Sequence, residues 1–515
     1  MNGERKNSKQ VKAGIVLSYT LIILNALYGL FLTPFILSSL GDSEYGVYKT
    51  ITSLTSSLMV LDLGIGSTVM RYVAKYRAKN EDDKIPNFAA MNLLQAALLC
   101  VIVAIVSTAI FFSIKPVYSS SFTMAEIQKA QSLFIILALN ILVHIIENVF
   151  NGIITGSNRF GFGNGVKLIR LALRISFTVI LLLFIKNSLV LVLLDLTLTI
   201  LCVMVEMFYV YNVLHIKVKF SHWDKSIFFE SGKYTMLMFL TSIAAQVNNN
   251  LDNVIIGAIS GPTRVAVYSM GLLIFAMYEH LSTAISGVML PTVTNILEGE
   301  NAKAAITKLI VRVGRIQFML LGAAVVGFAC IGKYFINIWL GQGYEDVYII
   351  TLILMIPSLF ELCVNVCLSI LRAKNMLTFR TLTLFASTLM NALITVFAVK
   401  YWSYIGAAFG TAASFIIGSL VVMNIYYYKK LKLPMLKIYG QIVNRTWVCL
   451  IISGAALFAL SRITSTGLVA MIINILFFCI IYGATLILYG FSDKEKEHIP
   501  LINKLFVSKQ TKGDT

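Results

Sequence analysis

Long apolar stretches separated by short polar segments run along this chain from residue 13 to residue 490. A helix rises about 1.5 Å per residue, so about 20 apolar residues cross the roughly 30 Å hydrocarbon core of a bilayer. The pattern predicts fourteen such helices, at residues 13–40, 45–70, 88–114, 131–156, 168–186, 188–212, 234–259, 265–296, 316–340, 347–371, 378–399, 404–428, 443–461 and 467–490. The expected fold class is therefore an all-α polytopic membrane protein.

The composition agrees with this interpretation and excludes an ordinary soluble protein. Of the 515 residues, 58% are hydrophobic and only 13% are charged. The N-terminus has no short apolar core followed by a small-residue cleavage site, so the first helix is expected to stay in the mature protein. All seven cysteines lie within predicted spans, which predicts neither a disulfide framework nor a metal site.

The net charge of +18 follows the predicted topology. Of the 42 lysines and arginines, 34 lie in the two termini and in the connections after the even-numbered helices. The opposite face keeps Lys49, Lys115, Lys129, Lys186, Arg264, Lys333, Lys400 and Arg462. Positive charge concentrates on cytoplasmic loops, so both termini are expected in the cytoplasm and nucleic acid is not an expected partner.

Three short matches indicate an internal repeat. GDSEYGVY at 41–48 resembles GPTRVAVY at 261–268, the segment 144–162 resembles 361–379, and 203–209 resembles 421–427. The offsets of 217 to 220 residues span an even number of helices, which predicts two six-helix lobes of the same orientation. The predicted domains are an N-lobe at 1–220, a C-lobe at 221–435, two appended helices at 436–490 and a basic cytoplasmic tail at 491–515.

Four motifs carry a family resemblance: LGDSEYGVY after the first helix, DLGIGSTVMRYVAKYRAKN through the second, LDNVIIGAISGPTRVAVYS across the seventh and eighth, and IGAAFGTAAS opening the twelfth. Together with the helix count, they resemble the Wzx-type polysaccharide (O-antigen) flippases of the MOP superfamily, relatives of lipid II flippases and MATE exporters. The resemblance implies alternating access in a bacterial plasma (inner) membrane. The implied cargo is an undecaprenyl-diphosphate-linked oligosaccharide, moved to the outer leaflet for O-antigen, capsule or exopolysaccharide synthesis.

A diphosphate cargo would need cations in the cavity. Arg170 and Arg174 share one face of the fifth helix with Lys167, and Arg174 is the deepest of the three. Arg71 lies at the inner end of the second helix, and Lys308, Arg312 and Arg315 form a similar stripe at the start of the ninth. A guanidinium suits bidentate phosphate recognition, but each of these residues could instead anchor the topology by reaching the headgroups.

A polar arc in the seventh helix is the second cavity candidate. In QVNNNLDNVIIG at 246–257, the side chains of Asn249, Asn250, Asp252 and Asn253 share one side with Gln246 and Asn248. Such an arc suits sugar hydroxyls, and a polar seam between the lobes is the alternative interpretation.

Carboxylates within predicted spans are the candidates for ion coupling, because an acid in hydrocarbon needs a partner, water or a cation. Seven lie within predicted spans: Asp62, Glu147, Asp195, Glu206, Asp252, Glu279 and Glu361. The coupling candidates among them are Asp62, Glu147, Glu279 and Glu361, and interhelical hydrogen bonding is the alternative role. Coupling to Na⁺ or H⁺ is the resulting hypothesis, and no other cofactor is expected.

No catalytic constellation is found, so the chain is not expected to be an enzyme. The longest outer connection, roughly 114–130, is short and holds no His or Arg, which disfavours a membrane glycan polymerase. A MATE-like drug/cation antiporter is the other alternative, and the many inner cations favour an anionic cargo. The expected partners are the lipid-linked oligosaccharide and bilayer lipids, with a glycan polymerase and glycosyltransferases of the same pathway as candidates.

Overall fold

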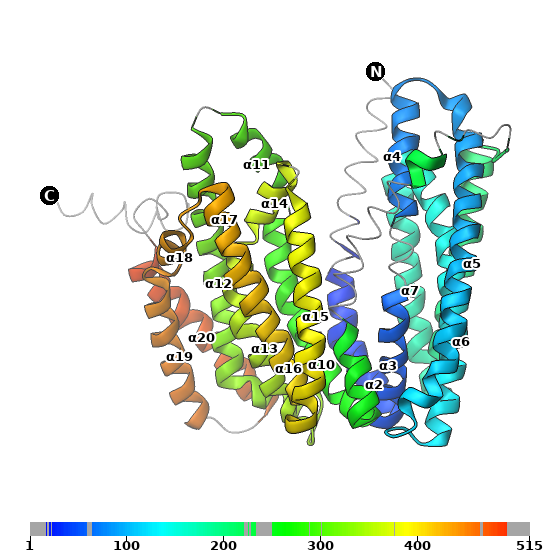
Figure 1. Ribbon diagram of the computed structural model, residues 1–515. Coiled ribbons are helices and arrows are strands. Elements are labelled where there is room, and N and C mark those ends of the chain that lie inside the picture. Colours follow the sequence, from blue (N-terminus) through cyan, green and yellow to red (C-terminus); the bar gives the residue numbers. More distant parts are fainter. Residues whose placement is uncertain are drawn as a thin grey trace. The chain divides into compact units, whose positions relative to one another are not determined.

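The computed structural model describes residues 17, 20–21, 23–58, 64–220, 225, 228–232, 250–287, 289–299, 301–374, 376–463 and 467–491 (Figure 1). Within these ranges the regular structure is helical. Eleven of the described helical segments are long and apolar enough to cross a membrane. The predicted all-α membrane fold is therefore confirmed.

The eleven segments correspond in order to eleven of the fourteen predicted spans, and the other three have separate explanations. The span 45–70 is divided between α3 (Asp42–Leu58) and α4 (Ile65–Ala78). The span 168–186 falls on α7 (Phe160–Phe184), which carries three basic residues in its apolar part. Most of the span 234–259 lies outside the described residues. The count of fourteen and the cytoplasmic termini stay predictions.

The chain divides into two compact units, residues 1–269 with 399–404 and residues 270–398 with 405–515. The lobes predicted at 1–220 and 221–435, with the appendix at 436–490, concern homology between halves and stay predictions.

Besides α3, α4 and α7, unit 1 contains η1 (Tyr28–Leu32), α2 (Thr33–Leu40), η3 (Asp82–Lys84), α5 (Ile85–Tyr118), α6 (Met124–Gly156), α8 (Ser188–Phe208), η4 (Tyr209–Val213), helical residues 250–260 and the first turns of α10 (Pro262–Ser286).

Helix α6 lies at the centre of unit 1, packed against α3, α4, α5 and α8. Two glycines permit its close crossing with α4. A Cβ atom at Gly152 would lie 2.8 Å from Gly66 O, and one at Gly156 would lie 2.7 Å from Met70 O. In membranes, where lipid is as apolar as leucine, small residues of this kind let helix backbones approach and pack.

The first turn of α3 and the segment 250–262 are packed together within unit 1. A Cβ atom at Gly46 would lie 1.8 Å from Pro262 O, and one at Gly257 would lie 2.8 Å from Thr50 Cγ2. Both contacts therefore require glycine. They also explain why residues 250–269 belong to this unit.

The matching segments 41–48 and 261–268 begin with a similar backbone conformation. Gly41 (φ +80°) and Gly261 (φ +84°) both adopt left-handed backbone and each directly precedes a helix, α3 or α10. Positive φ is accessible to glycine without a Cβ clash. The match at an offset of 220 residues thus reflects a shared helix-entry geometry.

Unit 2 is built around the long helix α12, which packs against α13, α18 and α19. Its elements are α10 from Met270 onward, α11 (Leu290–Leu297), α12 (Ala302–Trp339), α13 (Asp346–Cys363), α14 (Val366–Ala373), α15 (Leu377–Trp402) without residues 399–404, α16 (Ile405–Ser414), η5 (Phe415–Val422), α17 (Met423–Leu431), α18 (Met435–Val443), α19 (Thr446–Ile463), α20 (Leu468–Thr485) and η6 (Leu486–Gly490).

Arg315 joins three parts of unit 2 and is not a headgroup anchor. Its Nη1 donates to Gln441 O and Asn444 O at 3.1 Å, and its Nη2 donates to Gly490 O at 2.9 Å. Only 9% of the residue is exposed. Arg315 therefore caps the carbonyl ends of α18 and η6. The sequence left open whether Lys308, Arg312 and Arg315 reach out to the lipid headgroups, and for Arg315 that interpretation is wrong.

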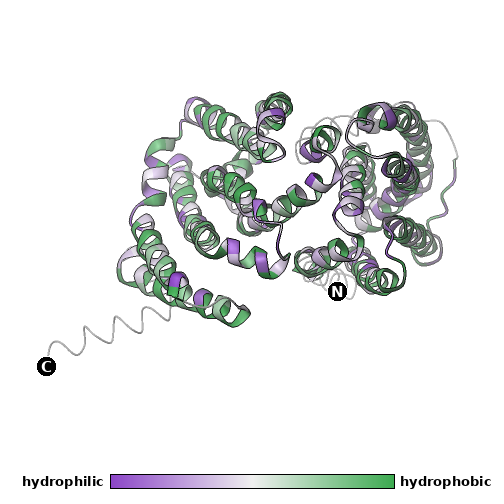
Figure 2. Ribbon diagram, turned by 90° about the horizontal axis from the view of Figure 1, so that it is seen from below, coloured by the Kyte–Doolittle hydropathy of each residue, from purple (hydrophilic) through white to green (hydrophobic). Residues whose placement is uncertain are grey.

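Hydrophobic residues predominate along the helices of each unit (Figure 2). On α5, for example, Leu98, Ile105 and Phe112 are well exposed in the isolated chain. Exposed apolar surface on this scale requires lipid contact. The protein is a multi-pass membrane protein.

Candidate functional site

A bidentate ion pair joins α7 and α8 within unit 1. Arg174 Nε lies 2.8 Å from Asp195 Oδ1, and Arg174 Nη2 donates to Asp195 Oδ2 at 2.8 Å. Two charge-assisted bonds fix the plane of the guanidinium as well as its charge. The side chains remain 33% and 16% exposed. A ligand can therefore reach a cation that is already oriented.

A second pair lies one helical turn earlier on α7. Arg170 Nη1 is 3.4 Å from Glu147 Oε2, and Arg170 Nη2 donates to the Thr199 hydroxyl at 2.7 Å. His144 Nε2 lies 3.7 Å from the same carboxylate, of which 7% is exposed. Glu147 is thus buried between a permanent cation and an imidazole, the side chain whose ordinary charge change falls near neutral pH.

Glu206 on α8 is a third carboxylate in this region and is fully buried. Its Oε1 accepts a hydrogen bond from Asn151 Nδ2 at 2.8 Å. Its Oε2 has no hydrogen-bond partner in the part of the chain that the structure describes. A buried carboxylate with one satisfied oxygen is suited to hold a proton or a small cation.

Three residues around Arg174 were not predicted from the sequence to be site residues. The Tyr28 ring centroid lies 5.2 Å from Arg174 Cζ, and the Tyr48 side chain lies close enough to interact with the same guanidinium. Lys49 on α3 interacts electrostatically with Arg174. A signal for Lys49 existed, because it is a lysine within the predicted span 45–70 and intramembrane cations are commonly functional. The tyrosines gave none, since aromatic residues are abundant in these helices.

Unit 2 contains a separate polar cluster. Glu361, Asn365, Arg380 and Ser419 line a cavity of about 30 Å³. Ser419 and Glu361 face the same cavity, and Arg380 and Glu279 interact electrostatically with the Glu361 carboxyl. A cavity of this size holds one or two water molecules. Two of the predicted ion-coupling residues, Glu279 and Glu361, are therefore close enough to influence each other's charge.

The polar arc of the predicted seventh helix is described only from Asn250 onward. Asp252 Oδ2 accepts a hydrogen bond from the Tyr268 hydroxyl at 2.6 Å. Asn253 Nδ2 donates to Ser53 Oγ at 2.9 Å. Both residues are buried, and Asn250 is half-buried. These bonds hold the segment 250–260 within unit 1, and a role for the arc in sugar recognition stays a prediction.

The remaining predicted residues are not brought into these clusters. Arg71 is exposed on α4. Asn249 and Asp62 lie outside the described residues. The structure thus assembles Arg170, Arg174 and Glu147 in unit 1, and Glu279 and Glu361 in unit 2.

Comparison with known proteins identifies the family. Residues 39–349, more than half of the chain, match the model of a family described as polysaccharide biosynthesis protein. The chain belongs to this family. Among polysaccharide biosynthesis proteins, a Shigella flexneri protein described as a candidate O-antigen transporter is 23% identical over 400 residues, which cover 76% of this chain and 92% of the relative.

Solved structures show the same fold. The lipid II flippase MurJ in an inward closed conformation aligns with a TM-score of 0.70 and 13% identity, covering 92% of this chain and 97% of that one. An inward-facing multidrug resistance MATE transporter of the MOP superfamily aligns with a TM-score of 0.61 and 15% identity, covering 80% and 96%. Both solved structures are of transporters, so this polysaccharide biosynthesis protein has a fold that membrane transporters share.

Proposed function

We propose that the protein is a flippase that moves an undecaprenyl-diphosphate-linked oligosaccharide from the inner to the outer leaflet of the bacterial plasma membrane. Coupling to Na⁺ or H⁺ is part of the proposal. The observation that carries it is the bidentate pair of Arg174 and Asp195 within an apolar helical unit. The family supplies the class of cargo, and the pair supplies chemistry for the charged part of that cargo.

A diphosphate and a carboxylate present similar planar oxygen pairs to a guanidinium. Asp195 therefore occupies the position that a cargo phosphate would take on Arg174. The exchange of one anion for the other keeps the arginine paired throughout, which avoids the cost of an isolated charge in a low-dielectric region. Tyr28, beneath the guanidinium, maintains its position during the exchange.

Cation coupling in this proposal depends on the Asp195 carboxylate that the cargo displaces. Once a cargo phosphate occupies Arg174, an ionised Asp195 would be unpaired, and proton or Na⁺ binding would neutralise it. Glu147 and the fully buried Glu206 are further acceptors on the neighbouring faces of α6 and α8. In unit 2, Glu279 and Glu361 offer a second place for a coupling cation.

The experiment follows the cargo in reconstituted vesicles. Full-length protein is incorporated with a synthetic undecaprenyl-diphosphate oligosaccharide, and the glycan exposed on each leaflet is measured with an impermeant glycosidase. We expect the protein to equilibrate the glycan between the leaflets and an imposed Na⁺ or H⁺ gradient to bias it. Equilibration that ignores both gradients would remove cation coupling from the proposal and leave flipping.

The MATE-like fold supports a drug/cation antiporter as a second candidate function. The same vesicles distinguish the two when loaded with a lipophilic cationic dye in place of the glycan lipid. Gradient-driven dye export with no glycan movement would reject the flippase proposal. In cells, loss of the protein should accumulate glycan-diphosphate-lipid on the inner leaflet, whereas unpolymerised units at the outer face would contradict flipping.

A further inference from the structure

A wide basic groove lies in unit 2, apart from both polar clusters. It has a volume of about 1250 Å³ and is formed by the first turns of α12, the end of α17 and the helix α18. Four lysines line it: Lys303, Lys308, Lys429 and Lys432. None of the residues that line it, all of them described, is acidic. The groove is therefore strongly electropositive.

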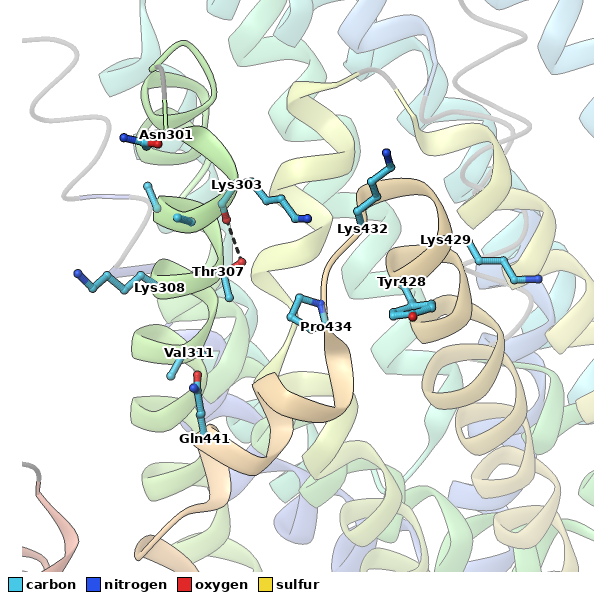
Figure 3. A pocket seen from close by; sticks show the side chains of 12 residues that line it. Asn301, Lys303, Thr307, Lys308, Val311, Tyr428, Lys429, Lys432, Pro434 and Gln441 are labelled. Atoms are coloured by element: carbon cyan, nitrogen blue, oxygen red, sulfur yellow. Dashed lines mark hydrogen bonds between the residues drawn. The ribbon is translucent and has the colours of Figure 1, made fainter.

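Two of the four lysines point into the groove (Figure 3). Lys303, from the first turn of α12, and Lys432, from the turn between α17 and α18, extend into the space between these elements. Lys308 and Lys429 also line the groove, and their side chains extend toward its outer edges. Lys303 and Lys432 are therefore the first candidates for contact with a small anion in the groove.

The backbone holds Lys432 in place. The residue adopts a left-handed conformation (φ +53°) as the C-cap of α17. Leu433 directly after it is buried, its N–H donates to Tyr427 O at 3.2 Å, and Pro434 starts α18. A lysine on such a fixed turn loses less conformational freedom on binding than one on a flexible loop.

The start of α12 adds a second favourable field. This helix is 38 residues long, and Lys303 lies in its first turn. Helix N-termini carry partial positive charge and unpaired N–H groups that bind phosphate-like anions. The lysine pair and the helix end favour the same ligand, an oxyanion such as a phosphate.

The amphipathic helix α18 indicates that this phosphate belongs to a lipid. Met435, Ile438 and Ile442 are buried against the unit, whereas Leu436, on the same helix but outside the lining of the groove, is 90% exposed. A short helix with an exposed leucine and basic neighbours is typical of an element in the membrane interface. This end of α12 and α17 also carries connections predicted to be cytoplasmic, where the leaflet is anionic.

We propose that this groove binds the headgroup phosphate of an anionic glycerophospholipid from the cytoplasmic leaflet. Lys303 and Lys432 hold the phosphate oxygens, the N-terminus of α12 faces the phosphate, and Leu436 contacts the acyl chains. The site is separate from the proposed flippase site, so it can be tested whatever cargo the protein carries.

The test is native mass spectrometry of the full-length protein in detergent, titrated with phosphatidylglycerol or phosphatidylcholine. We expect phosphatidylglycerol to bind preferentially and the double variant Lys303→Gln/Lys432→Gln to weaken it about tenfold to thirtyfold, since each lysine near a lipid phosphate contributes about fivefold. The matched double variant Lys430→Gln/Lys437→Gln removes the same charge from exposed positions of α17 and α18 that do not line the groove, and it should bind as the wild type does. The charge-preserving Lys303→Arg/Lys432→Arg should retain binding.

Two results would overturn the proposal. One is an equal loss in both glutamine double variants, or in neither, because binding would then follow overall charge or occur elsewhere. The other is displacement of phosphatidylglycerol by an equimolar amount of inorganic phosphate, which would assign the site to a free anion. Retained lipid in excess inorganic phosphate, together with weaker binding by Leu436→Ser, would support it.

Discussion

Arg174 on α7 and Asp195 on α8 hold each other through two contacts of 2.8 Å. The pair lies over the ring of Tyr28 and next to the pair of Arg170 with Glu147. Paired charges of this kind cost less in an apolar protein than isolated ones, and each arginine can change partners without losing a counter-charge. Their arrangement makes this part of unit 1 the first target for mutation.

Replacing Arg174 should stop glycan movement while the protein still inserts. Arg174→Gln removes the cation and leaves Asp195 unpaired, so we expect transport in vesicles to be lost. Arg174→Lys keeps the charge but not the bidentate geometry, and we expect at least a roughly tenfold loss of rate. Lys186→Gln, which removes an exposed cation just after α7, is the control and should transport normally. Wild-type rates in Arg174→Gln would contradict the role of this residue.

Asp195→Asn tests the exchange of anions on Arg174. The neutral amide cannot neutralise the guanidinium, so Arg174 should bind a phosphate ligand more tightly and release it more slowly. We expect a lower KM for the glycan lipid together with a lower maximal rate, and a weaker response to the imposed gradient. An unchanged gradient response would exclude Asp195 as the coupling carboxylate.

Glu44 predicts a pH-dependent contribution to the stability of unit 1. It lies 2.8 Å from Lys129 Nζ and accepts the Ser188 N–H at 2.5 Å. Partial burial acts to raise the pKa of the Glu44 carboxyl, but these bonds outweigh it and hold the pKa below its ordinary value. The stabilisation is therefore present above the unfolded pKa of about 4.3 and is lost as the pH falls through the folded pKa.

We expect Glu44→Gln to lower the stability of the protein in detergent by about 1 kcal/mol at neutral pH. The difference from the wild type should disappear in acid, below the ordinary range of a glutamate. Thermal unfolding at several pH values measures this, with the exposed Asp83→Asn as a control that changes neither curve. A difference that persists at low pH would show that the carboxylate charge is not its source.

The crossing of α4 and α6 predicts a steric effect. Gly152→Ala would place a Cβ atom 2.8 Å from Gly66 O and from Val69 Cβ. Because backbone cannot yield as a flexible side chain does, we expect a loss of roughly 1–3 kcal/mol. Gly165→Ala on α7 meets nothing within 4 Å, so helix propensity should make it neutral or stabilising by up to about 1 kcal/mol. Equal thermal stability of the two variants would argue against the close packing.

Arg315 should be among the most important residues for the stability of unit 2. Arg315→Met leaves the carbonyls of Gln441, Asn444 and Gly490 without their guanidinium donor, and we expect a loss of roughly 2–4 kcal/mol. Arg312→Met, three residues earlier and exposed, is the matched control and should change stability little. Thermal unfolding that is unaffected by Arg315→Met would restore the interpretation of Arg315 as a headgroup anchor.

Much of the architecture was predictable from the sequence because the bilayer imposes it locally. A helix must satisfy its own backbone and expose apolar side chains to lipid, so hydropathy alone identified the spans that the structure describes. The distribution of basic residues predicted a topology, and the motifs that begin at Gly41 and Gly261 marked the starts of two helices. Each of these features depends only on residues that are close in the sequence.

The sequence also identified the charged residues of the site but not their partners. Arg174 was a candidate because it is the basic residue deepest in its predicted helix, and Glu147 was a candidate because it is a charged residue within a predicted span. That Asp195 pairs with Arg174, that Tyr28 lies beneath it, or that Arg315 caps carbonyls more than a hundred residues away depends on which helix faces meet. Packing between distant segments decides this, and periodicity within one helix does not encode it.

The lysine groove illustrates the same division. The sequence alone identified the basic residues and predicted the side of the membrane on which they lie. Only the tertiary structure showed that Lys303 and Lys308 line one groove together with Lys429 and Lys432, which lie more than a hundred residues later in the chain. The physical reason is that charge distribution along the chain follows the membrane potential and lipid asymmetry, whereas a groove shared by two distant segments requires the turn between α17 and α18 to pack beside α12.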